Sequence, residues 1–73
     1  MTYPMTRIAR RDGLAHGLRW EGPNGDGSFG SLSLDFIEGI AASYGEEGSP
    51  VYMRAFFFGR RKAREAAIAA YLD

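Results

Sequence analysis

The chain has 73 residues, nine basic and nine acidic side chains, and no cysteine. A chain of this length forms a single domain, residues 1–73, and without cysteine it has neither disulfides nor thiolate metal ligands. Its apolar runs are too short for a secretory signal or a membrane span, so we expect a cytoplasmic protein with no membrane partner.

The first half of the chain has the pattern of a β-sheet. Residues 5–11 predict a strand, and the Asp-Gly pair that follows is typical of a hairpin turn. Large side chains then alternate with small or charged ones over residues 14–20, which predicts a second strand. Residues 22–27, GPNGDG, have the composition of a loop, and alternation resumes over residues 31–36 as a third strand.

The pattern changes near residue 35. Apolar residues recur at helical spacing from Phe36 to Tyr44, which favours a helix over 35–44, and a longer third strand is the alternative. Ser33 and Asp35 are the candidate caps for this helix. Gly45 is a candidate for a left-handed residue at its end.

The remaining elements complete an α+β order. Residues 46–50 predict a loop, and the β-branched and aromatic run over 51–58 predicts a strand that Gly59 ends. Residues 60–72 are rich in alanine and predict a helix. The resulting order, β-β-β-α-β-α, predicts the α+β class, with a small antiparallel sheet of three to four strands and helices packed on one face.

The predicted last helix has an unusual charge pattern. Arg60, Arg61 and Lys62 stand in its first turn, where the positive end of the helix dipole disfavours cations. We expect a negative group to offset this cost, either an internal carboxylate or an acidic partner. Residues 66–72 are all apolar, so we expect them to be buried against the sheet or against another chain.

Charge is segregated along the sequence, which indicates a binding protein. Residues 21–47 contain six carboxylates and no cation, and both ends of the chain are basic. We expect a small non-enzymatic interaction protein with a macromolecular partner, possible examples being phage-type inhibitors of a host nucleoprotein, similar in role to anti-CRISPR proteins. The predicted partner-binding residues are Arg54, Arg60, Arg61, Lys62, Arg64, Glu46 and Glu47.

Two other functions fit the same residues. In the first, the chain is a nucleic-acid binding module in which the arginines contact phosphate and aromatic rings stack on bases. The residues for that role are Arg7, Arg10, Arg11, the cluster at 60–64, Phe56 and Tyr52. In the second, the chain is a homodimer joined through the outer face of the predicted 51–58 strand.

Motifs for catalysis, cofactors or metals are weak. The segment GDGSFG at 25–30 matches the glycine pattern of dinucleotide sites but does not stand between a strand and a helix. Residues 24–35 partly fit a calcium loop, but Phe29 stands where glycine is required. His16, the one histidine, alternates with leucines and is expected to be a half-buried structural residue. We therefore expect no enzymatic activity, cofactor or metal.

Overall fold

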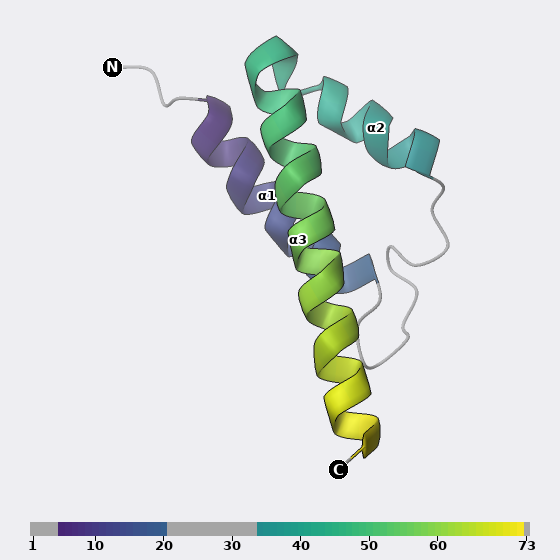
Figure 1. Ribbon diagram of the computed structural model, residues 1–73. Coiled ribbons are helices and arrows are strands. Elements are labelled where there is room, and N and C mark those ends of the chain that lie inside the picture. The colour runs from purple at the N-terminus through teal and green to yellow at the C-terminus, as the bar shows by residue number, and fades with distance from the viewer. Residues whose placement is uncertain (1–4, 21–33, 73) are drawn as a thin grey trace.

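The computed structural model describes residues 5–20 and 34–72. Over these ranges the protein is all-α, with helices α1 (Met5–Trp20), α2 (Leu34–Ala42) and α3 (Gly45–Leu72) and no strand. Helix α3 is the long axis of the fold, α1 runs beside its first half in the same direction, and α2 lies near its N-terminal end (Figure 1). None of these helices combines the length and the apolar character needed to cross a bilayer.

Helices α1 and α3 pack with their backbones in contact because glycines line the crossing. A Cβ atom on Gly13 would lie 2.4 Å from the carbonyl oxygen of Tyr52, and one on Gly17 would lie 2.0 Å from that of Phe56. Any side chain at these positions would therefore push the helices apart. Small residues recur at every fourth position on both helices: Ala9, Gly13 and Gly17 on α1, and Ala55, Gly59 and Ala63 on α3.

The core is built around two aromatic rings of α3. Tyr52 and Phe56 are fully buried, and their nearly parallel rings have centroids 6.3 Å apart. Ile37 and Ala41 from α2 and Ala9 from α1 complete the buried cluster. Full burial of one large apolar side chain stabilises a fold by about 1.5–3 kcal/mol, so these two rings supply much of what holds α3 to its neighbours.

The junction between α2 and α3 confirms two predictions. The backbone N–H of Ser43 donates to the carbonyl of Ile40 at 3.1 Å, and that of Tyr44 donates to Ala41 at 3.0 Å, which closes the last turn of α2. Gly45 then takes a φ of +81°, a left-handed conformation that costs glycine little. The helix predicted over 35–44 is present as α2, Leu34–Ala42, with residues 43–44 in a turn, and the predicted left-handed role of Gly45 is correct.

The predicted α+β class is wrong. Three segments that were predicted as strands lie wholly within the described residues. They are 5–11, 14–20 and 51–58, and all three are helical. Part of the reason is Gly13, which follows aspartate as it would in a hairpin turn but instead allows α1 to approach α3. The predicted loop at 22–27 and the first part of the predicted strand at 31–36 lie outside the described residues.

The predicted start of the last helix is also wrong. Helix α3 begins at Gly45, so the supposed loop at 46–50 forms its first turns and Gly59 lies in its interior. The cations at 60–62 therefore stand in the middle of a helix, and the predicted dipole penalty does not arise. Glu46 and Glu47 occupy the first turn instead, where the dipole favours negative charge.

The far end of α3 differs from expectation as well. Residues 66–72 are helical as predicted, but α3 continues beyond the end of α1 (Figure 1). In the described protein Ile68 is 52% exposed, Tyr71 88% and Leu72 76%. The predicted burial of this segment within the chain is therefore not found, and burial against another chain stays a prediction.

Candidate functional site

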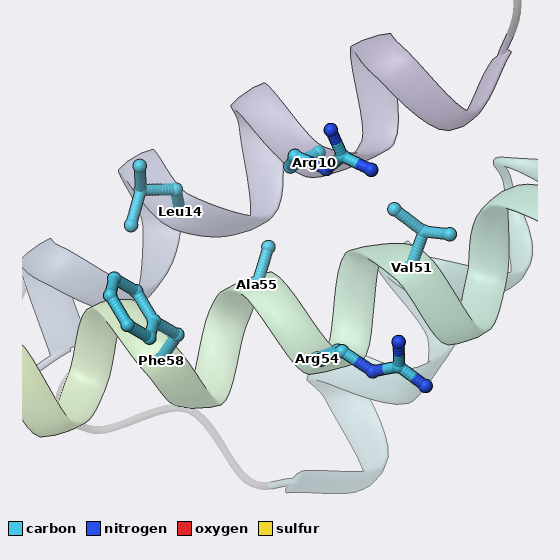
Figure 2. A pocket seen from close by; sticks show the side chains of 6 residues that line it. All are labelled: Arg10, Leu14, Val51, Arg54, Ala55 and Phe58. Carbon is cyan, nitrogen blue, oxygen red and sulfur yellow. The ribbon is translucent and has the colours of Figure 1, made fainter.

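A groove of about 360 Å³ lies between α1 and α3 and is the candidate binding site. Its floor is apolar: Leu14 and Phe58 lie at one end, Val51 at the other, and Ala55 between them (Figure 2). The groove exists because small residues bring the two helix backbones together beneath it, while larger side chains stand along its edges. We refer to it below as the α1–α3 groove.

Two arginines stand at opposite edges of this groove, one from each helix. Arg10 projects from α1 and Arg54 from α3 (Figure 2), and both are exposed. No described carboxylate forms an ion pair with either guanidinium. Each arginine presents a planar set of five N–H donors, the geometry that matches a carboxylate or phosphate with two parallel hydrogen bonds.

A second basic region continues along α3 beside the groove. The guanidinium carbon of Arg61 lies 5.9 Å from the centre of the Phe58 ring, and the Lys62 Nζ lies 5.4 Å from it. Lys62 also pairs with Glu65 at 3.6 Å, and both side chains are exposed. Shallow hollows lie around Phe57 between these cations. Phe57 and Phe58, two exposed aromatic residues of α3, thus lie beside positive charges.

The structure separates the sequence-predicted binding residues into several groups. Arg54, Arg61, Lys62 and Arg64 are exposed on α3, and Arg60 is half-buried. The predicted acidic contacts, Glu46 and Glu47, are exposed in the first turn of α3, well before the basic region along the same helix.

The residues predicted to contact nucleic acid are also divided. Arg10, from the residues predicted to bind nucleic acid, and Arg54, from those predicted to bind a protein partner, both line the α1–α3 groove. Arg7 is exposed on α1, and Arg11 is exposed but paired with Asp12. Tyr52 and Phe56 are fully buried in the core and therefore cannot stack on a base without unfolding.

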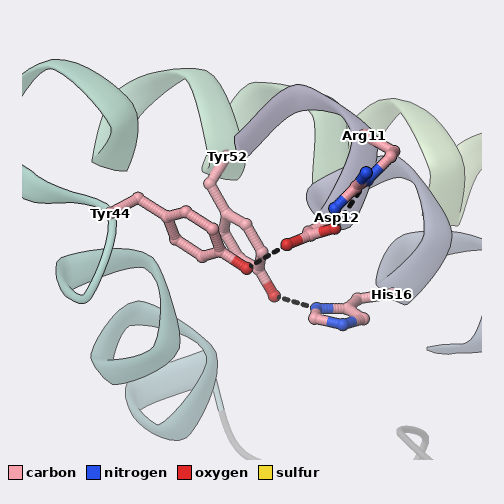
Figure 3. A network of polar contacts seen from close by, with 5 residues as sticks. All are labelled: Arg11, Asp12, His16, Tyr44 and Tyr52. Atoms are coloured by element: carbon pink, nitrogen blue, oxygen red, sulfur yellow. Dashed lines mark hydrogen bonds and ion pairs between the residues drawn. The ribbon is translucent and has the colours of Figure 1, made fainter. Parts of the chain in front are cut away.

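A polar network on another side of α1 joins this helix to α3 and to the turn between α2 and α3 (Figure 3). The Tyr44 hydroxyl donates to the Asp12 Oδ2 at 2.7 Å, and the Arg11 Nε donates to the other carboxylate oxygen at 3.2 Å. The His16 Nδ1 and the Tyr52 hydroxyl are hydrogen-bonded at 2.6 Å. The Tyr44 and Tyr52 rings stack with centroids 5.0 Å apart, which joins the two halves of the network.

The network shifts the ionisation of its members. The hydrogen bond from Tyr44, supported by Arg11, lowers the pKa of Asp12 and keeps it ionised. Burial lowers the pKa of His16, which favours the neutral ring. Burial raises the pKa of Tyr44 to about 12, with the Asp12 hydrogen bond adding to the effect, and burial together with the Asp12 charge raises that of Tyr52 to about 12.

This arrangement is suited to holding helices together. Asp12 and His16 stand one turn apart on α1, and each hydrogen-bonds a tyrosine from the opposite side of the interface. None of the hollows described above is lined by these groups. His16 is half-buried, as predicted, and it is bonded to the core. Within the described ranges, no three His, Asp or Glu side chains come together as a metal ion would require.

Sequence reasoning missed most of the groove and of the network. Leu14, Val51 and Phe58 lie in segments whose patterns predict strands, and Asp12 precedes a glycine as it would in a hairpin turn. The available signal was the spacing of small residues at every fourth position on both segments, which favours two helices in close contact.

Comparison with known proteins gives no assignment: no family model matches the chain, and no curated protein or solved structure matches it.

Proposed function

We propose that this protein is a non-enzymatic binding protein whose α1–α3 groove takes an acidic, amphipathic segment of a protein partner. The observation that supports this most directly is the pair Arg10 and Arg54, which stand at opposite edges of an apolar groove without a described carboxylate partner. Such a site combines a hydrophobic pocket with charge-assisted hydrogen bonds, and an amphipathic helix with acidic flanks supplies the complement to both.

The binding step follows from the geometry of the groove. An apolar side chain of the partner enters between Leu14 and Phe58, which removes apolar surface of both molecules from water. Carboxylates on either side of it meet the guanidinium groups of Arg10 and Arg54. Because both arginines are solvent-exposed at the rim, we expect their charges to govern specificity and association rate more than affinity.

A protein segment fits this site better than nucleic acid. A polyanion needs cations along its path, whereas the floor of the groove is apolar. The chain also has no net charge, and modules dedicated to nucleic acid carry a positive excess. Single-stranded nucleic acid is the alternative ligand, because Phe57 and Phe58 are exposed beside Arg61. Proteins that bind single strands stack the bases on aromatic rings next to cations.

The proposal is tested with a defined probe. We would label a synthetic peptide that places leucine at every third or fourth position and glutamate between, and measure its binding by fluorescence anisotropy. Arg10→Glu is expected to weaken binding by about tenfold, because it replaces an attraction at the rim by a repulsion. Arg19→Glu is the matched control, since it makes the same charge change at another exposed position of α1 that does not line the groove.

The outcomes separate the alternatives. Equal loss of binding in Arg10→Glu and Arg19→Glu would show non-specific charge attraction and would overturn the role of the groove. Tighter binding of a single-stranded oligonucleotide than of the peptide, with an affinity that falls steeply with salt, would favour the nucleic-acid alternative. The cytoplasmic location and the narrower hypothesis of a nucleoprotein inhibitor stay predictions that neither experiment addresses.

A further inference from the structure

The last two turns of α3 form an apolar end that the other described helices leave largely uncovered. Residues 66–72 carry no polar group except the hydroxyl of Tyr71, and this part of α3 continues beyond the end of α1 (Figure 1). Its large side chains, Ile68, Tyr71 and Leu72, are all exposed. A contiguous exposed apolar surface of this kind marks a contact with a partner or with a membrane.

Positive charge is concentrated immediately before this apolar end. Residues 60–65, called the basic stretch below, contain four cations and one carboxylate, a net charge of +3. Arg61 and Lys62 are exposed, and each lies over the ring of Phe58. Exposed apolar side chains next to a cluster of cations are the combination that attracts a protein to an anionic lipid surface.

The apolar end and the basic stretch share one side of the helix. At about 100° per residue, an aromatic ring, a cation and two aliphatic side chains fall within about 60° of one another around the axis. They are Phe57, Arg61, Ile68 and Leu72, and all four are exposed. This side is opposite the buried Ala63. When it faces a lipid surface, the aliphatic side chains enter the apolar region and the long Arg61 side chain reaches back to the headgroups.

The length of the apolar end matches the depth of a membrane interface. Seven helical residues extend over about 10 Å, and interfacial helices bury their apolar faces about 5–10 Å into the boundary between headgroups and acyl chains. A carboxylate avoids hydrocarbon, so Asp73, the next residue in the sequence, favours a shallow, tilted contact over end-on insertion. The expectation of no membrane partner was based on the lack of a spanning segment, which a contact with one leaflet does not need.

A second copy of the chain complements this surface less well than lipid does. Parallel packing of two copies through the apolar end brings their basic stretches together, and like charges repel. Antiparallel packing of the two apolar ends overlaps only about two turns, a short contact compared with the extent of a stable interface. A nucleic acid would pair with the cations but would leave Ile68 and Leu72 in water.

The acidic start of α3 does not oppose a contact at its far end. Glu47 precedes Arg61 by fourteen residues, about 21 Å along the helix. Charges are screened over about 8 Å at physiological ionic strength, so Glu46 and Glu47 have little effect on lipid phosphates near Arg61. The negative charge of the first turn therefore leaves the attraction between the basic stretch and an anionic surface largely unchanged.

We propose that the second half of α3 binds an anionic lipid surface, with Ile68, Tyr71 and Leu72 in the headgroup region and Arg61 and Lys62 on lipid phosphates. The pair of Lys62 with Glu65 is exposed, so exchanging Glu65 for a phosphate costs little. This contact lies further along α3 than the residues that line the α1–α3 groove and goes beyond the proposed function. It places the groove close to a membrane.

Co-sedimentation of the full chain with phospholipid vesicles measures the contact. We expect binding to phosphatidylcholine vesicles that contain about 30% phosphatidylserine and much weaker binding to phosphatidylcholine alone. Arg61→Glu and Ile68→Asn are each expected to lower the partition coefficient by about tenfold, the first through charge and the second through lost apolar contact. The matched controls, Arg7→Glu on α1 and Leu34→Asn on α2, change exposed residues outside the contact and are expected to bind as the unaltered protein does.

A fluorescent label tests whether the apolar end enters the lipid. The chain has no native cysteine, so Tyr71→Cys and Glu47→Cys each accept a single environment-sensitive dye. Vesicles are expected to shift the emission of the dye to the blue at position 71 but not at position 47. Circular dichroism checks that each variant keeps its helices.

Four results would overturn the proposal. They are no binding to the phosphatidylserine vesicles, losses in the control variants as large as those in Arg61→Glu and Ile68→Asn, an unchanged emission at position 71, and tighter binding of a single-stranded oligonucleotide that Arg61→Glu weakens and Ile68→Asn does not. The last result would assign the basic stretch to nucleic acid instead.

Discussion

Replacement of Gly17 by alanine tests the packing on which the whole fold depends. The new Cβ would lie 2.0 Å from the carbonyl oxygen of Phe56 and 2.9 Å from the backbone nitrogen of Arg60. Both neighbours are backbone atoms, so no side-chain rotation relieves the clash. Helix α1 has to move away by about 1.4 Å before the closer of these contacts reaches van der Waals distance. A gap of about 0.5–1 Å between packed surfaces already loses a quarter to a half of the dispersion energy of the contacts across it.

The expected magnitude is the difference of two effects. Alanine is favoured over glycine inside a helix by about 1 kcal/mol, whereas overpacking of a rigid site typically costs about 1–3 kcal/mol and occasionally more. Because this clash involves backbone on both helices, we expect the upper end of that cost, and a net loss of about 2 kcal/mol in the free energy of unfolding. For a domain of this size, that corresponds to a fall in Tm of roughly 8–16 °C.

The assay is thermal and urea unfolding followed by the helical circular dichroism signal. Gly39→Ala is the matched control because this glycine lies inside α2 and a Cβ there would meet nothing within 4 Å. It should stabilise the protein by about 0.5–1 kcal/mol. The close backbone contact between α1 and α3 would be refuted if the Gly17→Ala variant had the same free energy of unfolding as the unaltered protein. A rise in that free energy as large as the one for Gly39→Ala would refute it too.

Three further predictions concern the polar network. Burial lowers the pKa of His16 on folding, so the unfolded chain binds the proton more readily. The free energy of unfolding should therefore fall as the pH drops through about 6.5, and His16→Gln should remove that fall in urea titrations. At the alkaline end the raised pKa values of Tyr44 and Tyr52 should make stability fall above about pH 10, as the unfolded tyrosines ionise first. Tyr52→Phe keeps the buried ring but removes the hydroxyl bonded to His16, and should cost about 1 kcal/mol in the same assay.

The elements that could be predicted are those whose local signals agree with the tertiary fold. Residues 35–44 have apolar residues at helical spacing and end in glycine, and α2 and its left-handed Gly45 follow that pattern. The alanine-rich end of the chain was also recognisable as helix, although its start was placed fifteen residues too late, at 60 instead of 45.

The segments that were mispredicted contain glycines with a tertiary role. Each interior glycine costs a helix about 1 kcal/mol, so Gly13, Gly17 and Gly59 locally favour turns and strand ends. That cost is offset only when two helices meet and the glycines let their backbones touch, an effect that local propensity does not contain. The segment 51–58 shows the same conflict between local and tertiary signals. Its aromatic residues locally favour a strand. In the fold, Tyr52 and Phe56, four residues apart, are both buried, which only a helix achieves on one face.

The candidate site could be predicted in chemistry but not in position. The sequence identified arginines and aromatic residues as the binding groups, and Arg10 and Arg54 do stand at the groove. Their pairing depends on the parallel alignment of α1 with α3, which places residues 10 and 54 opposite each other. An antiparallel sheet offers no such alignment, so the incorrect fold class separated Arg10 and Arg54, which the structure places at one groove.

The same glycine-mediated packing explains why α3 has an unoccupied face. Close backbone contact with α1 uses a narrow row of small residues, and the large rings of Tyr52 and Phe56 take up the space towards α2. Phe57, Ile68 and Tyr71 are therefore left outside a core that contains few large side chains. A domain of this size has little stability to spare, and association through the exposed face would add to it by mass action. The inner face of α3 therefore forms the core with its neighbours, and the outer face is exposed to solvent.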